Sequence, residues 1–138
     1  MKVMPTQTFR SDLGNLEKIC NFVTIYAKQA GLNERQVYAV QLAVDEAATN
    51  IIEHGYRCSG HGDVQITCEP EVDGLRVILH DHAPPFDPDE IPEPITDVPL
   101  EDLKPRGLGI FLMRRMMDEV TYEFNTEEGN TLTLVKRK

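Results

Sequence analysis

The sequence predicts an α+β fold, a two-layer α/β sandwich in which three helices pack on one face of a mixed, mostly antiparallel sheet. Two kinds of pattern lead to this fold class: short segments with strand-like alternation, and longer segments with helical spacing between them. Their order is strand, helix, helix, strand, strand, long loop, helix, strand, strand, with no internal repeat. With 138 residues, 41% of them hydrophobic, we expect residues 1–138 to form a single domain with one core.

The N-terminal half predicts one strand and two helices. Residues 6–10, TQTFR, are typical of a short strand, and apolar residues then recur at helical spacing up to Gly31, which favours a helix stop. A second helix is expected to begin behind Asn33 as its N-cap and to run to about His54. Its expected buried stripe consists of Val37, Val40, Val44, Ala47 and Ile51.

The C-terminal half predicts two hairpins separated by a loop and a helix. Residues 63–69 and 75–81 alternate as an antiparallel strand pair, and residues 84–105 then contain seven of the nine prolines, which excludes regular helix there. A helical pattern restarts behind glycines, and two alternating strands around a Glu-Gly-Asn turn end the sequence. The apolar side of this third helix is expected to carry Ile110, Met113, Met117 and Val120.

Composition excludes several classes of protein. The formal net charge of -9 opposes tight binding of a polyanion such as nucleic acid. No segment approaches the roughly 20 apolar residues that a membrane-spanning helix requires. The three cysteines form no C-x-x-C pair, so a disulfide framework is not expected. These features predict a cytoplasmic protein that contacts neither membrane nor nucleic acid directly.

A polar ridge lies along the second predicted helix. Glu46, Asn50 and His54 are spaced four residues apart, so on a helix they form one ridge beside the buried stripe. A carboxylate there can deprotonate a nucleophile, and an amide oxygen one turn away is a suitable ligand for Mg²⁺ carrying phosphates. The same spacing also fits an ordinary solvated helix edge.

Two further stretches favour nucleotide chemistry. Asp81 stands at a strand end, where its oxygens can accept a hydrogen bond from an exocyclic amine. Gly107 and Gly109 precede or open a helix, and backbone N–H groups at a helix N-terminus bind phosphate. Lys104 and Arg106 add positive charge beside them.

Together these stretches resemble the GHKL, or Bergerat-fold, ATPase superfamily, and within it most of all the anti-sigma-factor serine kinases. The resemblance covers nearly the whole chain, and its motifs occur in the family's order. They are Glu46-x-x-x-Asn50, Asp81, Gly107-x-Gly109 and Gly129-Asn130-Thr131.

The resemblance implies a role for each matching residue. Glu46 is the implied general base, Asn50 the Mg²⁺ ligand and Asp81 the carboxylate that selects adenine. Ala83 stands where the family's D-x-G element has glycine, and Thr131 is implied as a further partner near Asp81 and the base. The proline-rich residues 84–105 correspond to the ATP lid. The implied phosphate-binding turn consists of Arg106, Gly107, Leu108 and Gly109.

The leading hypothesis is therefore a serine kinase that uses ATP and Mg²⁺, phosphorylates an anti-sigma-factor antagonist and sequesters a sigma factor. Homodimerisation is implied by the same resemblance. A second hypothesis is an ATP- or ADP-responsive regulatory binding protein without kinase turnover.

Two alternatives concern other residues. One is a partner-binding surface formed by the methionines near residue 115 with Phe111, although the spacing of Met113 and Met117 is more typical of core. The other is a structural zinc site, although the spacing of its candidate ligands matches no common zinc motif. Those candidates are His54, Cys58, His61, Cys68, His80 and His82.

Overall fold

The computed structural model describes residues 4–57, 60–84, 113–125 and 127–138. Residues 113–116 are helical, η1 is a 3-10 helix and η2 is a π-helix. The elements in chain order are β1 (Thr6–Arg10), η1 (Leu13–Asn15), α1 (Leu16–Gln29), α2 (Glu34–Asn50), η2 (Ile51–Gly55), β2 (Asp63–Glu71), β3 (Gly74–Asp81), β4 (Glu119–Asn125) and β5 (Gly129–Arg137).

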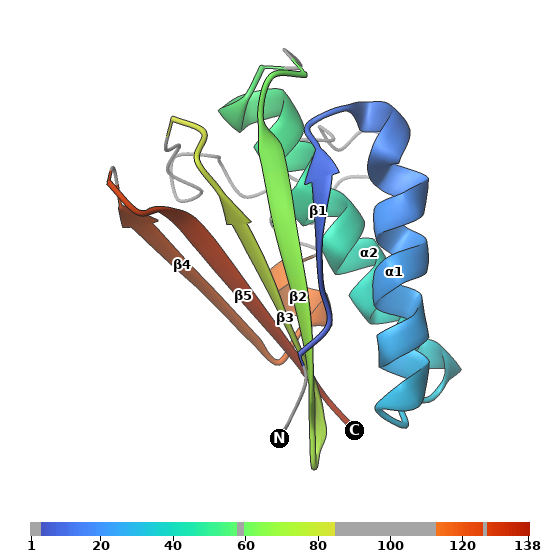
Figure 1. Ribbon diagram of the computed structural model, residues 1–138. Helices are drawn as coiled ribbons and strands as arrows, with labels where there is room; N and C mark the ends of the chain where they lie inside the picture. The colour runs from blue at the N-terminus through green and yellow to red at the C-terminus, as the bar shows by residue number, and fades with distance from the viewer. Residues whose placement is uncertain (1–3, 58–59, 85–112, 126) are drawn as a thin grey trace, which may run out of the picture.

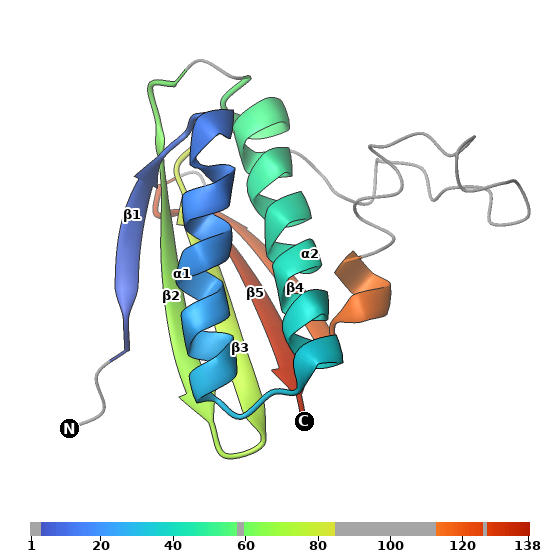
Figure 2. The ribbon, with the colours of Figure 1, turned by 90° about the vertical axis from the view of Figure 1, so that its right-hand side faces the viewer.

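The strands form one five-stranded sheet with the order β1-β2-β3-β5-β4. Helices α1 and α2 run side by side over one face of this sheet, as Figures 1 and 2 show from two directions. The predicted α+β two-layer sandwich is confirmed. Every strand pairing among the described residues is antiparallel, so that part of the sheet is not mixed.

The helix boundaries follow local chemistry. Gly31 adopts a positive φ of 87° behind α1, where its N–H donates to the carbonyl of Lys28 at 3.0 Å. Asn33 caps α2: its side chain accepts from the N–H of Gln36 at 2.8 Å, and the Gln36 side chain accepts from the Asn33 N–H at 2.9 Å. The predicted helix stop and N-cap are both confirmed.

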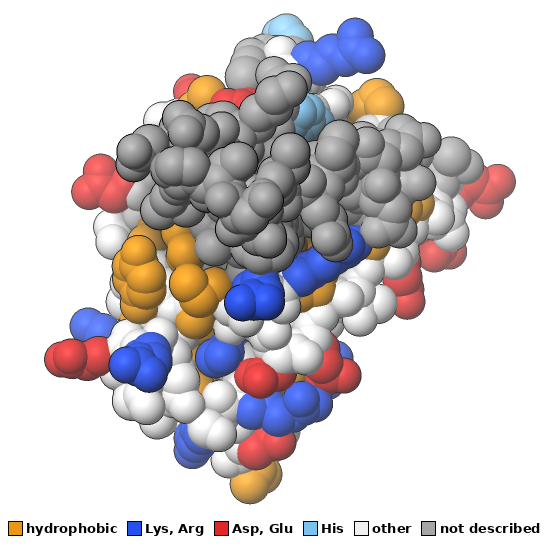
Figure 3. Space-filling view, turned by 180° about the vertical axis from the view of Figure 1, so that it is seen from behind, with side chains coloured by type: hydrophobic (Ala, Val, Ile, Leu, Met, Phe, Trp, Pro, Cys, Tyr) orange, Lys and Arg blue, Asp and Glu red, His pale blue; other side chains and the backbone are white. Residues whose placement is uncertain are grey.

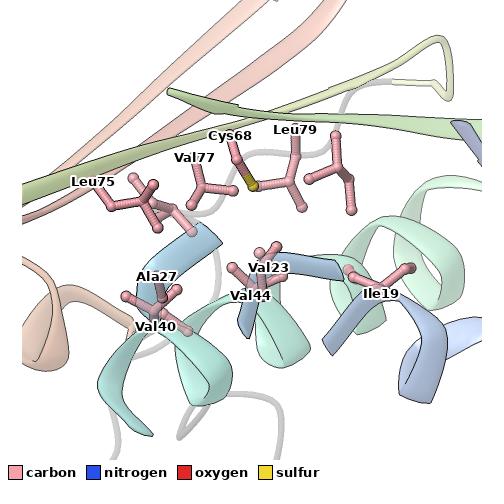
Figure 4. Close-up of a cluster of buried hydrophobic side chains, with 14 of the residues drawn as sticks. Ile19, Val23, Ala27, Val40, Val44, Cys68, Leu75, Val77 and Leu79 are labelled. Carbon is pink, nitrogen blue, oxygen red and sulfur yellow. The ribbon is translucent and has the colours of Figure 1, made fainter. Parts of the chain in front are cut away.

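The core lies between the helices and the sheet. In Figure 4 alternate side chains of β3, Leu75, Val77 and Leu79, point toward Val23 of α1 and Val44 of α2. The period of two in a strand places all three on one face. The whole predicted stripe, from Val37 in α2 to Ile51 in η2, is also buried, which confirms it.

The third helix ends earlier than its pattern predicted. Met113 and Met117 are buried as expected, but Val120 lies in β4, where it pairs with Leu134. Helical and strand spacing both place Val120 on the inner side of the molecule, so its apolar character did not distinguish a helix from a strand. A β-branched residue such as valine is favoured in the strand. Ile110 and Phe111 lie outside the described residues.

Charged side chains of both signs are interspersed over the described part of the face shown in Figure 3. Within the ranges given above, no helix combines the length and the hydropathy that a bilayer crossing needs. Cys20 and Cys68 are free thiols.

Candidate functional site

The candidate site lies at the end of the sandwich where β3 and the helical segment α2–η2 both finish (Figure 1). Asp81 is the last residue of β3 and continues the inward-facing series of Leu75, Val77 and Leu79. The alternation that builds the core therefore turns this carboxylate toward the helices, and only 5% of the residue is exposed. A buried carboxylate at this position requires hydrogen-bond partners.

Two groups hold the Asp81 carboxylate in place. Its Oδ1 accepts from the N–H of Ala83 at 2.9 Å and from Nδ2 of Asn130 at 3.0 Å. Burial raises the pKa of Asp81, while these two hydrogen bonds and the nearby His80 and His82 act in the opposite direction. The carboxylate is thus fixed in orientation at the inner face of the sheet.

The structure corrects the expected neighbour of Asp81. Thr131 was expected near this carboxylate, but it pairs with His80, and its hydroxyl lies 3.0 Å from His80 Nδ1. Asn130 is the residue opposite Asp81 in the β3–β5 register. Neighbouring residues of a strand point to opposite faces, so Thr131 faces away from the helices and Asn130 takes the contact.

A π turn at the end of the second helix brings further residues to Asp81. The predicted helix continues to Gly55, but beyond Asn50 it widens into η2, in which the N–H of Tyr56 donates to the carbonyl of Ile51 at 2.9 Å. Such turns are frequent at functional sites. The sequence pattern did not reveal this change, because the apolar spacing continues through it.

Gly55 and Tyr56 connect this π turn to the residues behind Asp81. A Cβ added at Gly55 would lie 2.8 Å from the Cβ of Ala83, so glycine permits this approach. The Tyr56 hydroxyl donates to the carbonyl of Asp63 at 3.0 Å and accepts from the N–H of His82 at 2.9 Å. Sequence reasoning assigned neither residue a role.

Ala83 fits its position without backbone strain. Arg57 is the only described non-glycine residue with a positive φ, so Ala83 does not need the conformation that favours glycine. Ala83 is buried, and its carbonyl accepts from Asn130 Nδ2 at 2.9 Å. The absence of glycine from this element therefore leaves the surroundings of Asp81 intact.

Gly129 approaches the backbone of Asp81 closely, and we expect Gly129→Ala to be strongly destabilising. Its φ is 95°, and a Cβ there would lie 2.5 Å from the carbonyl oxygen of Asp81. The conformation alone costs about 1–2 kcal/mol, and the overlap raises the expected loss of unfolding free energy to roughly 3 kcal/mol. Urea denaturation measures this loss.

Gly60→Ala is the matched control for that substitution. Gly60 also has a positive φ, 72°, but a Cβ there meets nothing within 4 Å. The Gly60→Ala variant should lose only the conformational part of the unfolding free energy, about 1–2 kcal/mol. Equal losses in the two variants would contradict the close approach at Asp81.

The polar ridge of Glu46, Asn50 and His54 is not a fully solvated helix edge. Asn50 is 4% exposed, and no described residue pairs with its Nδ2. Glu46 is half-buried, and its pKa is raised, first by burial and then by the charges of Asp45 and Glu53. His54 is half-buried within the π turn.

The helical residues 113–116 pack under β4 and β5. The Tyr122 hydroxyl donates to Met113 Sδ at 3.9 Å, and Lys136 Nζ donates to the carbonyl of Met116 at 2.8 Å. Burial raises the pKa of Tyr122 to about 12. The predicted lid, apart from exposed Pro84, and the predicted phosphate-binding turn at Arg106, Gly107, Leu108 and Gly109 lie outside the described residues.

The structure also bears on the two alternatives, a zinc site and a partner-binding surface of methionines. Among the residues described, no group of three His, Cys, Asp or Glu side chains could hold a metal ion, and Cys58 lies outside them. Met113 and Met117 belong to the core, as their spacing indicated. Arg115 is exposed and Met116 half-buried.

Sequence comparison adds a family to this geometry. A family model described as a histidine kinase-like ATPase domain matches residues 9–136. The serine-protein kinase RsbW of Halalkalibacterium halodurans is 30% identical over 114 residues, which are 80% of this chain and 68% of that protein. RsbW of Bacillus subtilis is also 30% identical, over 80% of this chain and 70% of its own length.

Structure comparison points to the same fold. The crystal structure of the RsbU and RsbW domains of Rv1364c from Mycobacterium tuberculosis aligns with 96% of this chain, with a TM-score of 0.66 and 15% sequence identity. This chain spans 32% of that larger one.

Proposed function

Because the chain belongs to the family of histidine kinase-like ATPase domains, we propose that it is an ATP-binding serine protein kinase and anti-sigma factor. It acts in the cytoplasm, phosphorylates a serine of an anti-sigma-factor antagonist and sequesters a sigma factor, with residues 1–138 as one ATP-binding domain. The RsbW relatives, which carry the name serine-protein kinase, support this reaction class. Homodimerisation belongs to the same proposal.

The observation that carries the proposal is the buried, oriented carboxylate of Asp81. A carboxylate on the inner face of the sheet, fixed by Ala83 and Asn130, retains acceptor capacity for the exocyclic amine of adenine. Such an acceptor favours adenine over guanine, which carries a carbonyl at the same ring position. Asp81 accordingly selects the base in our proposal.

Asn50 fits a role as ligand of Mg²⁺. It is a buried amide at the inner side of the helix, and its Nδ2 has no hydrogen-bond partner among the described residues. Amide oxygens are suitable ligands for this ion. Bound there, Mg²⁺ supplies charge neutralisation for the phosphates.

Glu46 is the proposed general base. It accepts the proton of the substrate serine as the serine oxygen forms a bond to the γ-phosphorus, and the bond from that phosphorus to the β–γ bridging oxygen breaks to release ADP. Its burial and the neighbouring Asp45 and Glu53 raise its pKa, which increases its affinity for that proton. In the proposal Arg106, Gly107, Leu108 and Gly109 hold the phosphates, and Ala83 lies beside Asp81 at the adenine site.

The proposal is tested by phosphate transfer from γ-labelled ATP to candidate antagonist proteins. We expect label on a serine of one antagonist, only in the presence of Mg²⁺. Tight ADP binding without transfer to any candidate would instead favour the regulatory binding protein without turnover.

Replacement of Asn50 should weaken the binding of Mg²⁺ without weakening the binding of the adenine base. We expect Asn50→Ala to lose most of the Mg²⁺-dependent increase in ATP affinity, because the variant lacks the amide ligand. Calorimetric titration with ATP, with and without Mg²⁺, measures this difference. The affinity without the ion should remain that of the wild type, and an undiminished Mg²⁺ effect in the variant would remove Asn50 from the ion site.

A further inference from the structure

Tyr56 carries a hydroxyl that joins two strands at the end of the sheet where Asp81 lies. The hydroxyl accepts from the backbone N–H of His82 at 2.9 Å and donates to the carbonyl of Asp63 at 3.0 Å. His82 directly follows β3, and Asp63 is the first residue of β2. A single side-chain oxygen from the residue after η2 therefore bridges the backbones of both strands.

The β2–β3 register shows which contact this bridge replaces. Val64 is the partner of Asp81 in the antiparallel pair, so a ladder that continued by one residue would set Asp63 opposite His82. In such a ladder the N–H of His82 could donate directly to the carbonyl of Asp63. Instead the Tyr56 hydroxyl stands between these two groups. The hydroxyl thus takes the place of the next backbone hydrogen bond and holds the two strands apart.

Packing fixes the place of this hydroxyl. The Tyr56 ring lies flat against Gly62, where an added Cβ would overlap the ring. Gly62 is itself held by the buried Ser11, because its N–H donates to Ser11 Oγ at 3.0 Å and its carbonyl accepts from the Ser11 N–H at 2.8 Å. The ring also packs against the hydrophobic core. The ring is therefore confined, and its hydroxyl reaches the two strands at one place.

The bridge acts on the turn that holds Asp81 in orientation. His82 alone separates Asp81 from Ala83, whose N–H donates to Asp81 Oδ1 at 2.9 Å. A contact from an aspartate side chain to the N–H two residues further on requires a turn, not extended strand. Continuation of the ladder would straighten this turn. The bridge to Tyr56 therefore preserves the hydrogen bond from Ala83 to the carboxylate.

We propose that Tyr56 is a positioning residue for nucleotide recognition, whose hydroxyl ends the β2–β3 ladder at Asp81 and keeps the following turn in the shape that orients the carboxylate. This inference rests on the proposed function, in which Asp81 selects the base. Tyr56 acts through the backbone of His82 and Ala83, so its role requires no contact with the nucleotide.

The test uses Tyr56→Phe, which removes the hydroxyl and keeps the ring. Calorimetric titration of the full chain with ADP and with GDP measures base selection as the ratio of the two dissociation constants. We expect this ratio to fall about tenfold, which is the effect of one hydrogen bond, because the carboxylate loses its fixed orientation. Hydrogen exchange followed by NMR should be about tenfold faster at the Ala83 amide, beyond any change in global stability.

Two further variants make the comparison specific. Tyr38→Phe makes the same chemical change at an exposed tyrosine of α2, and it should keep the wild-type ratio and the wild-type exchange rate. Gly62→Ala keeps the hydroxyl but displaces the ring, so it should lower the ratio as Tyr56→Phe does. Gly62→Ala also replaces Tyr56→Phe if circular dichroism shows the phenylalanine variant to be unfolded.

The outcomes separate this inference from the proposed function. An unchanged nucleotide ratio in Tyr56→Phe, with or without a loss of stability, would overturn the positioning role and leave Asp81 as the selecting residue. Wild-type protein that binds neither nucleotide would overturn the nucleotide site itself. Exchange at the Ala83 amide tests the bridge without any nucleotide, and an unchanged rate there in Tyr56→Phe would overturn it.

Discussion

Asp81→Asn should abolish adenine selection while the fold remains. The new side chain can keep its oxygen toward the N–H of Ala83 and the Nδ2 of Asn130. Its own NH2 then replaces the oxygen that faces the base, so two donors oppose each other. The loss of a hydrogen bond to a charged acceptor amounts to about 2–3 kcal/mol, or roughly a hundredfold in affinity for ADP.

Calorimetric titration with Mg-ADP measures this loss, and thermal unfolding checks the fold. Asp63→Asn is a suitable control, because Asp63 is an exposed carboxylate at the start of β2 and its side chain faces away from the helices. It should bind ADP like the wild type. Equal binding by Asp81→Asn and the wild type would remove Asp81 from the adenine role.

Glu46→Ala should retain nucleotide and lose phosphate transfer. The half-buried carboxylate is the proposed proton acceptor, and removal of a general base lowers a rate by about 10²- to 10⁴-fold. We therefore expect the labelled product to fall by that factor while ADP affinity is unchanged. Single-turnover transfer of labelled phosphate to the antagonist measures the chemical step.

Glu46→Gln and Asp45→Asn make the comparison specific. Glu46→Gln keeps the size of the side chain but cannot take the proton, so it should lose transfer as Glu46→Ala does. Asp45→Asn removes the neighbouring charge, one cause of the raised Glu46 pKa, and should lower that pKa. Its pH profile of transfer should shift toward lower pH, whereas full transfer by Glu46→Gln would exclude Glu46 as the base.

Much of the fold followed from local sequence patterns. The strand at 6–10, the stop at Gly31 and the cap at Asn33 each depend on residues a few positions apart, and all three are confirmed. The family resemblance, which joined motifs from the whole chain, is also confirmed. Val120 shows where such patterns fail, because one inward-facing residue satisfied both the helical and the strand period.

The site was predicted only in part. The sequence indicated Asp81 as a carboxylate at a strand end, and the structure buries it there. The roles of Glu46, Asn50 and the residues from Arg106 to Gly109 stay predictions. Tyr56 and Gly55 were missed, because their contacts depend on a π turn that leaves the apolar spacing unchanged.

The sequence alone determined the two-layer fold, the stop behind the first helix, the cap of the second and the place of Asp81 at a strand end, since these depend on periods of two and 3.6 residues and on capping groups. Only the tertiary structure decided which residue meets that carboxylate. Asn130 lies 49 positions from Asp81, and the register of β3 against β5 brings it there and turns Thr131 away. If the register of β3 against β5 were shifted by one residue, Thr131 would face the helices and Asn130 would face away from them, because neighbours in a strand face opposite sides.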